Sequence, residues 1–170
     1  MNLIFPFVLF HKEKDMKKMK VLLAIAVMVA AGKVAEAQQA DDQQPDRDRL
    51  RAAVQEICPV SGQKLGAHGA PVKVKIGEEQ LFLCCKGCMQ GEISPEHWAT
   101  IHANFAKAQG ICPVMKNALP EKAKWTIVEG RIVYVCCPPC TKKIEADPAT
   151  YLEKVDELYA ASLEKREEQQ

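Results

Sequence analysis

Two stretches of the chain repeat one another, and each carries four cysteines in the same order. Residues 57–60 (ICPV) recur as residues 111–114, and residues 82–88 (FLCCKGC) recur as residues 134–140 (YVCCPPC), at offsets of 54 and 52 residues. Each repeat is therefore about as long as one supersecondary motif. A chain of this kind folds as two related small units, and all 8 of its cysteines belong to the pattern C…CCxxC that both units keep.

Each copy has the pattern of a β-hairpin between its first cysteine and its cysteine pair. In the second copy, residues 125–128 and 131–135 are rich in β-branched and aromatic side chains and flank the turn sequence Glu129-Gly130. In the first copy, alternating valine, lysine and isoleucine residues over 72–76 are followed by the apolar run 81–83. The cysteine pair comes where the second strand of each hairpin should end.

Helices are predicted after each cysteine pair and before the first repeat. Ser94-Pro95 and Asp147-Pro148 each combine an N-cap side chain with a proline in the first helical turn. Apolar residues recur at helical spacing after both, and also in residues 46–57, at Leu50, Ala53, Val54 and Ile57. We expect an α+β fold in which two small ββα Cys-rich repeats are preceded by a short helix. The stripes after the prolines are Trp98, Ile101, Phe105 and Ala108, and Tyr151, Leu152, Val155, Leu158 and Tyr159.

The N-terminal part of the chain has the features of a secretory signal. A basic stretch at 16–20 precedes an apolar run of twelve residues, 21–32, and an A-x-A sequence ends at Ala37. That run is shorter than the about 20 residues of a membrane-spanning helix. We expect a signal peptide over 1–37, with Met16 as an alternative start, and a periplasmic or secreted product without a membrane partner. The expected organisation after it is a flexible leader (38–45), a helix (46–57), metal-binding repeats (58–110 and 111–163) and a charged tail (164–170).

The cysteines give these small units a source of folding energy that their apolar surface lacks. A two-stranded hairpin with one helix buries too little surface to be stable alone, and a bound zinc ion can supply the difference. The spacing Cys-x-x-Cys lets two thiolates reach one ion, and the cysteine before each hairpin approaches from the other side. We predict one Zn²⁺ or Cu⁺ ion per repeat, held by Cys58, Cys84, Cys85 and Cys88 and by Cys112, Cys136, Cys137 and Cys140.

The adjacent cysteines place a condition on this prediction. Consecutive side chains of an extended strand point to opposite faces of a sheet. Both members of the pairs Cys84-Cys85 and Cys136-Cys137 therefore reach one ion only if the strand has already ended at the pair.

The motif order resembles the YHS and TRASH group of small, treble-clef-like metal-binding domains. The similarity rests on Cys-Pro-Val, a hairpin, an aromatic-hydrophobic-Cys-x-x-x-Cys segment, and a helix that opens with residues 147–152 (DPATYL). It implies thiolate metal binding, a role in heavy-metal handling, sensing or resistance, and a metal-efflux or metal-delivery protein as partner. By the family motif the matching ligands are Cys84 with Cys88 and Cys136 with Cys140, joined by Cys58 and Cys112. This chain departs from the family because Cys58 and Cys112 precede Pro-Val, which the family's cysteine often follows, and because Cys85 and Cys137 are additional.

Two other functions remain open from the cysteine pattern. An even number of cysteines in an exported chain is also typical of a disulfide-stapled scaffold. A CxxC sequence at a helix start is typical of a thiol-disulfide oxidoreductase, although that fold needs a parallel βαβ framework. No Ser/His/Asp set or phosphate-binding glycine loop is visible, so we expect a protein that is not an enzyme. A net charge of +1 argues against a nucleic-acid partner.

The first prediction concerns processing. We expect the mature protein to begin at or near Gln38 and to be extracted without detergent, because the apolar run is followed by an A-x-A cleavage sequence. N-terminal sequencing of the exported protein tests this. An intact Met1 or Met16 on membrane-bound protein would contradict it.

Overall fold

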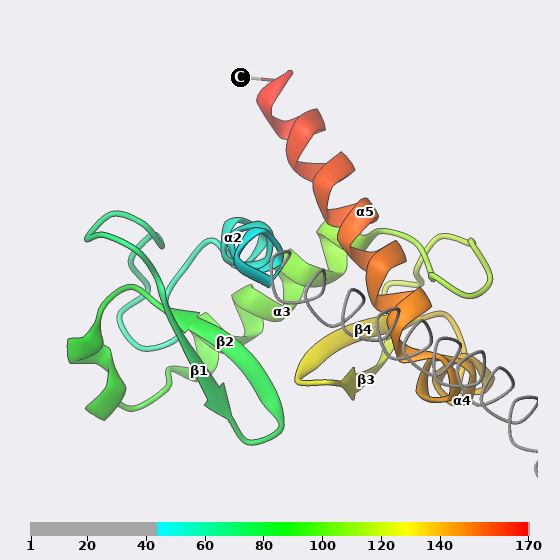
Figure 1. Cartoon of the computed structure of the whole chain (residues 1–170), viewed down its shortest axis with the longest axis horizontal. Helices are drawn as coiled ribbons and strands as arrows, with labels where there is room; N and C mark the ends of the chain where they lie inside the picture. Colours follow the sequence, from blue (N-terminus) through cyan, green and yellow to red (C-terminus); the bar gives the residue numbers. More distant parts are fainter. Residues whose placement is uncertain (1–43, 170) are drawn as a thin grey trace, which may run out of the picture. The chain divides into compact units, whose positions relative to one another are not determined.

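A computed structural model describes residues 44–169, so the predicted signal peptide and most of the predicted leader lie outside the described residues. The described part is mixed α+β and contains two antiparallel hairpins, each followed by helix, as the sequence predicts (Figure 1). In chain order the elements are α2 (Gln44–Gln55), β1 (Val72–Ile76), β2 (Glu79–Leu83), the 3₁₀-helix η1 (Lys86–Gln90), α3 (Pro95–Gln109), β3 (Lys124–Val128), β4 (Arg131–Val135), α4 (Pro139–Ala146) and α5 (Pro148–Glu167).

Both hairpins have two-residue turns whose backbone angles match the twist of the strands. In the first, Ile76 pairs with Glu79 and the first turn residue, Gly77, has a φ of 61°. In the second, Val128 pairs with Arg131, and both turn residues have positive φ, 51° at Glu129 and 75° at Gly130. Positive φ in these positions is the signature of primed hairpin turns.

Helices α3 and α5 begin at residues whose side chains cap them. The side chains of Ser94 and Asp147 accept hydrogen bonds from the backbone N–H groups of His97 and Thr150, and both helices carry a proline in the first turn. Gly110, with a φ of 61°, ends α3. The N-cap predictions are therefore confirmed.

The first helix differs from its prediction in bounds and in face. It spans Gln44–Gln55 rather than residues 46–57, and Ala53 is exposed while Arg51 and Ala52 are buried. The helix ends at Gln55 because Glu56 takes a left-handed φ of 67° and Ile57 forms an isolated β-bridge with Lys64. Of the predicted stripe, Val54 is buried, and Leu50 and Ile57 are partly buried against the core.

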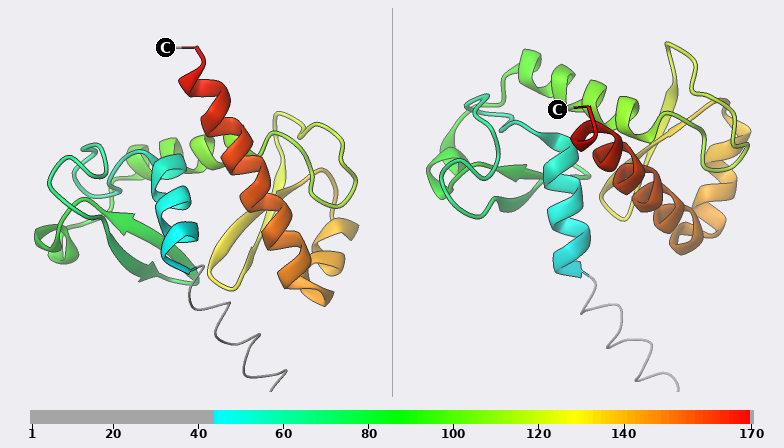
Figure 2. Two further views of the ribbon diagram at one scale, coloured as in Figure 1. Left: turned by 45° about the horizontal axis from the view of Figure 1, so that its top comes forward. Right: turned by 90° about the horizontal axis from the view of Figure 1, so that it is seen from above.

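Helix α3 connects the two repeats. Its N-cap residue Ser94 donates its backbone N–H to the carbonyl of Pro59 (3.0 Å), next to the first cysteine of repeat 1. Its last residue, Gln109, lies three residues before Cys112, the first cysteine of repeat 2. Figures 1 and 2 show α3 running from the half of the molecule that holds β1 and β2 to the half that holds β3 and β4. The helix thus closes one repeat and opens the next.

One apolar core serves both repeats. It combines buried residues of α2, α3, β2, β4, α4 and α5 with two of the cysteines, and its largest fully buried side chains are Tyr159, Phe105, Leu81, Ile101 and Ile144. The rings of Phe105 and Tyr159 lie 5.8 Å apart between their centroids and join α3 to α5. The hairpins are therefore stabilised by packing on shared helices and not by their own two strands.

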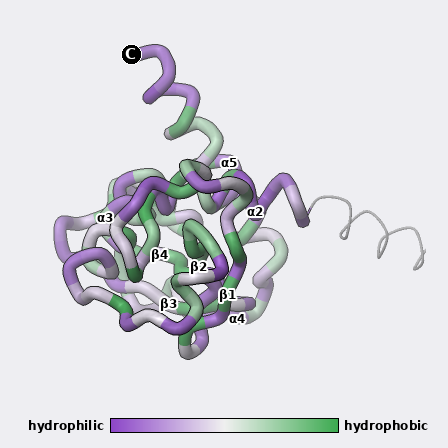
Figure 3. The backbone as a smooth tube through the Cα atoms, turned by 90° about the vertical axis from the view of Figure 1, so that its left-hand side faces the viewer, coloured by the Kyte–Doolittle hydropathy of each residue, from purple (hydrophilic) through white to green (hydrophobic). Residues whose placement is uncertain are grey.

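Helix α5 continues to Glu167, into the segment that the sequence suggested as a charged tail. Arg166 forms an ion pair with Glu56, the residue that follows α2. Figure 3 shows these last turns as hydrophilic. Among the described residues, no helix has both the length and the apolar character needed to cross a membrane.

The hairpins also meet directly. The backbone N–H of Gln80, at the start of β2, donates to the carbonyl of Gly130 in the β3–β4 turn (2.7 Å). A Cβ atom placed on Gly130 would lie 2.6 Å from the Gln80 side chain. A side chain at this position would therefore displace the Gln80 side chain, and the φ of 75° at Gly130 also favours glycine.

We expect Gly130→Ala to lower the free energy of unfolding by about 1–2 kcal/mol through its positive φ, with a further cost from the contact with Gln80. Denaturant unfolding of the single variants and of Gly130→Ala/Gln80→Ala measures both costs. The double variant should recover the part due to the contact. Strictly additive effects would contradict the close approach.

Candidate metal centres

The first cysteine of each repeat lies in a tight loop with the same hydrogen bonds in both copies. The cysteine N–H donates to the carbonyl five residues later, and the cysteine carbonyl accepts the N–H of the residue four positions later. These bonds are Cys58 N to Gln63 O (2.8 Å), Gly62 N to Cys58 O (2.9 Å), Cys112 N to Asn117 O (2.8 Å) and Lys116 N to Cys112 O (2.8 Å). The loop needs a left-handed residue, which is Gly62 in one copy (φ 69°) and Lys116 in the other (φ 58°).

The strand before each cysteine pair ends directly before the pair, so both cysteines can face the same side. Strand β2 ends at Leu83 and strand β4 at Val135, directly before the pairs. The two sulfur atoms of each pair are 4.0 Å apart in repeat 1 and 3.7 Å apart in repeat 2. The condition that the sequence set for both members to share an ion is met.

Site 1 contains Cys58, Cys84, Cys85 and Cys88. The Cys84 and Cys88 sulfur atoms are 3.6 Å apart, and the Cys85 sulfur lies 4.0 Å from each of them. Cys58, Cys84 and Cys88 have all their sulfur atoms within 4.8 Å of one another. The four thiols therefore come together from the loop before the hairpin and from the turn after it.

Site 2 contains Cys112, Cys136, Cys137 and Cys140. The Cys136 sulfur lies 3.7 Å from that of Cys137 and 3.9 Å from that of Cys140, and the last two are 3.4 Å apart. Cys112, Cys136 and Cys140 form the group whose sulfur atoms all lie within 4.8 Å of one another. The two sites thus repeat each other in ligand order and in spacing.

These separations match a shared metal ion. Four thiolates about 2.3 Å from a tetrahedrally coordinated zinc ion are about 3.8 Å from one another. The sulfur–sulfur distances of 3.4–4.0 Å within the cysteine turns lie around this value. Each site therefore has three thiols that lie close to one another, including the one from the loop before the hairpin, and Cys85 or Cys137 is a fourth thiol beside them.

The thiols of site 1 differ in acidity. Burial raises the pKa of Cys58, but the backbone N–H groups of Ser61 and Cys84 and the Ser61 hydroxyl lower it more, to about 6. The hydrogen bond of the Cys88 thiol to Cys84, together with burial, raises the Cys88 pKa to about 12. Cys58 in the loop is thus more acidic than Cys88 in the turn.

In site 2 the pKa of the loop cysteine is likewise lowered and that of the turn cysteine raised. Burial raises the pKa of Cys112, but backbone N–H groups, that of Cys136 first, lower it below the ordinary value. Burial and a hydrogen bond to Cys137 raise the pKa of Cys140. In both copies backbone N–H groups lower the pKa of the loop cysteine, and an ion bound there would displace protons from the other thiols.

A buried glutamine in each repeat joins the two cysteine-bearing segments, and the sequence analysis missed it. The Gln55 side chain accepts the N–H of Phe82 (2.9 Å) and donates to its carbonyl (2.7 Å). Gln109 does the same with Tyr134 (2.9 and 2.6 Å). Each amide also donates to the carbonyl two residues further on, that of Ile57 or Ile111 (2.9 Å).

These glutamines act as an additional strand partner. Each lies three residues before the loop cysteine and binds the backbone two residues before the cysteine pair, so it holds the two halves of the site together. Both side chains are buried, 0% exposed at Gln55 and 1% at Gln109. The signal was present in the sequence, because the repeated motif extends to Gln-x-Ile-Cys-Pro-Val.

His97 and His102 of repeat 1 are not among the clustered metal-ligating residues. His102 lies 3.2 Å from the Glu79 carboxylate, and its ring packs against Trp98 with a centroid distance of 5.1 Å. His97 lies against Gly62 of the site 1 loop. Neither belongs to a group of close metal-ligating atoms in the described part of the chain.

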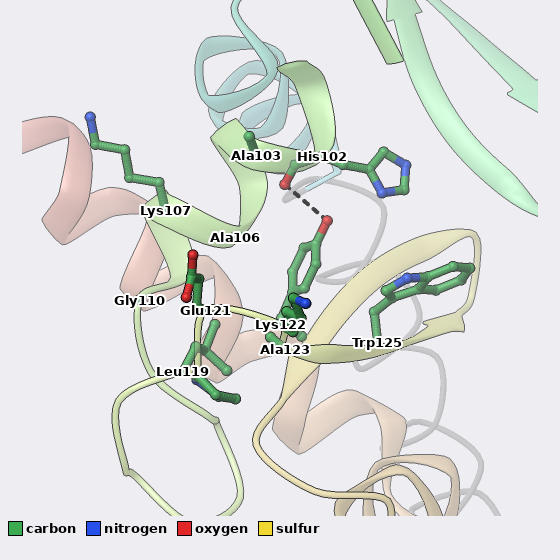
Figure 4. A pocket seen from close by; sticks show the side chains of 12 residues that line it. His102, Ala103, Ala106, Lys107, Gly110, Leu119, Glu121, Lys122, Ala123 and Trp125 are labelled. Carbon is green, nitrogen blue, oxygen red and sulfur yellow. Dashed lines mark hydrogen bonds between the residues drawn. The ribbon is translucent and has the colours of Figure 1, made fainter. Parts of the chain in front are cut away.

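A separate hollow of about 500 Å³ lies beside α3 (Figure 4). It is lined by α3, by the loop that leads to β3 and by Trp125, and the Tyr134 hydroxyl donates to the His102 carbonyl there (2.9 Å). No cysteine is among the residues that line it. The hollow is therefore not part of either cysteine site.

Comparisons with protein-family models, with curated proteins and with solved structures found no match for this chain. The functional argument therefore depends on the geometry of the two cysteine sites.

We expect Gln109→Ala to lower the free energy of unfolding by about 2–5 kcal/mol, because it leaves the buried N–H and carbonyl of Tyr134 without partners. Gln55→Ala should act similarly on site 1. Chemical denaturation of the reduced protein measures both effects.

The matched control is Gln90→Ala, at an exposed glutamine of η1. It should change stability by less than about 0.5 kcal/mol. Equal stability of all three variants and the parent would show that the buried amides do not hold the sites together.

Proposed function

We propose that this protein binds metal ions through cysteine thiolates, with one Zn²⁺ or Cu⁺ ion in each four-cysteine site. One observation supports the proposal above all others. Each repeat brings three thiols to within 4.8 Å of one another, in the same ligand order in both copies, and a fourth thiol lies 3.4–4.0 Å from two of them.

The ligand type favours soft or borderline ions. Thiolates select Zn²⁺ and Cu⁺, whereas Mg²⁺ and Ca²⁺ prefer oxygen ligands. The close groups of metal-ligating atoms found in the described residues consist of cysteines alone. Four thiolates suit tetrahedral Zn²⁺, and three of the four suit Cu⁺.

A disulfide-exchange function has less support from the fold. The described strands pair only as two antiparallel hairpins, whereas a thioredoxin-like enzyme presents its CxxC motif on a parallel βαβ framework. In each site a third and a fourth thiol also lie beside the CxxC pair. A disulfide joins only two sulfur atoms, so this arrangement fits a shared ion better.

The cellular role follows from the resemblance and the signal sequence. We infer that the protein is exported to the periplasm or secreted, does not act as an enzyme and takes part in heavy-metal handling, sensing or resistance. The resemblance to YHS and TRASH domains supports this role. The proposed partner is a metal-efflux or metal-delivery protein, which donates the ion or receives it.

Native mass spectrometry of the reduced protein tests the proposal. We expect it to bind two Zn²⁺ ions, and Cys88→Ser and Cys140→Ser to remove one ion each, since each variant removes one ligand of one site. Met115→Leu, which changes a half-exposed thioether within the site 2 loop but no thiol, is the control and should keep both ions. Co²⁺ loading should give the absorption spectrum of tetrahedral thiolate coordination.

Other outcomes would contradict the proposal. Reduced protein that binds no ion and rapidly reduces protein disulfides would indicate an oxidoreductase. Exported protein without free thiols and without metal would indicate a disulfide scaffold.

A further inference from the structure

The two sites have the same cysteine pattern but differ in the linker between two cysteines, in the helix that follows and in the apolar cluster around them. We propose that site 1 is the exchangeable site, which takes up and releases the ion, and that site 2 keeps its ion as a permanent part of the fold. This inference rests on the proposed metal-binding function and assigns different roles to its two sites.

The residues between the ligands are the first difference. Cys85 and Cys88 are separated by Lys86-Gly87, whereas Cys137 and Cys140 are separated by Pro138-Pro139. Proline restricts φ and lowers the entropy of open states, while glycine widens the range of backbone angles. The turn that carries two ligands of site 1 therefore opens more easily than its counterpart in site 2.

The helices behind the turns are the second difference. Helix α4 has eight residues and buries Cys140 and Ile144, which are 2% and 0% exposed. The 3₁₀-helix η1 has five residues and buries none of them, so Cys88 is only half-buried. Helix α4 packs against β3 and α5, whereas η1 packs chiefly on β2. In Figure 1, η1 is the short green helix at the left edge, away from α5.

The apolar surroundings are the third difference. Cys112 and Cys140 belong to the main core that joins α2, α3, β4, α4 and α5. Cys58 and Cys84 belong to a separate small cluster whose remaining buried residue is Leu83. Opening site 2 thus disturbs the core of the whole described domain, whereas opening site 1 disturbs a peripheral cluster.

These differences give a route for exchange. Local opening is easiest where few apolar contacts hold a segment, and in site 1 that segment is η1 with its preceding turn. A chelating ligand replaces Cys85 and Cys88 at the ion, and each released thiolate takes up a proton from water. Cys58 and Cys84, which are buried, release the ion last.

Timed release from the doubly loaded protein tests the inference. Protein with two bound Zn²⁺ ions is mixed with excess EDTA and N-ethylmaleimide, followed by native mass spectrometry and by peptide mapping of alkylated cysteines. We expect a one-ion form to accumulate in which the site 1 cysteines are alkylated about tenfold faster than those of site 2.

Two variants that keep all eight thiols test the cause. Pro138→Lys/Pro139→Gly gives site 2 the linker of site 1 and should speed release from site 2. Gly87→Ala should slow release from site 1, because alanine restricts the backbone angles of the turn. The folded site can hold the added methyl group, which would lie 3.6 Å from the Cys85 sulfur.

The outcomes separate this inference from the proposed function. Two ions that leave at the same rate, or site 2 emptying first, would overturn the division of roles and leave metal binding intact. Linker variants with unchanged release rates would also overturn it. Protein that takes up no ion would overturn both.

Discussion

Bringing four thiols to one point is the constraint on which the rest of this structure depends. Thiolates at about 4 Å repel one another, so a cluster of four cannot lose its protons without a compensating cation. Backbone N–H groups around Cys58 and Cys112 lower the pKa of these two thiols, whereas the pKa values of Cys88 and Cys140 are raised. Everything else in each repeat positions two chain segments so that this cluster forms.

The buried glutamines show how such small units hold the cluster in place. A two-stranded hairpin offers an outer edge with unpaired backbone groups, and here the amides of Gln55 and Gln109 pair with that edge beside the cysteines. The helix that ends at each glutamine therefore positions the loop cysteine and the cysteine pair together. Helix α3 does this for repeat 2 while its N-terminus contacts the loop of site 1. The repeats are coupled because they share this helix and one core.

The same ligand pattern has different surroundings in the two halves. Helix α5 covers the hairpin of repeat 2 with Leu152, Val155 and Tyr159, so the cysteines of site 2 become part of the main core. The helix after the hairpin of repeat 1 is α3, whose buried side chains face the main core. The two copies thus have matching thiol spacing and different apolar surroundings.

Much of this arrangement was determined by the sequence itself. The repeat, the hairpins at Gly77 and Glu129-Gly130, the caps at Ser94 and Asp147 and the grouping of cysteines are local signals, because turns, caps and ligand spacing depend on nearby residues. Three features were decided only by the tertiary structure: the end of the first helix at Gln55, the strands that the buried glutamines pair with, and the different apolar clusters that surround the two sites. These depend on which surfaces pack together. Local patterns do not contain that information, since an apolar or amide side chain looks the same in the sequence whichever partner it meets.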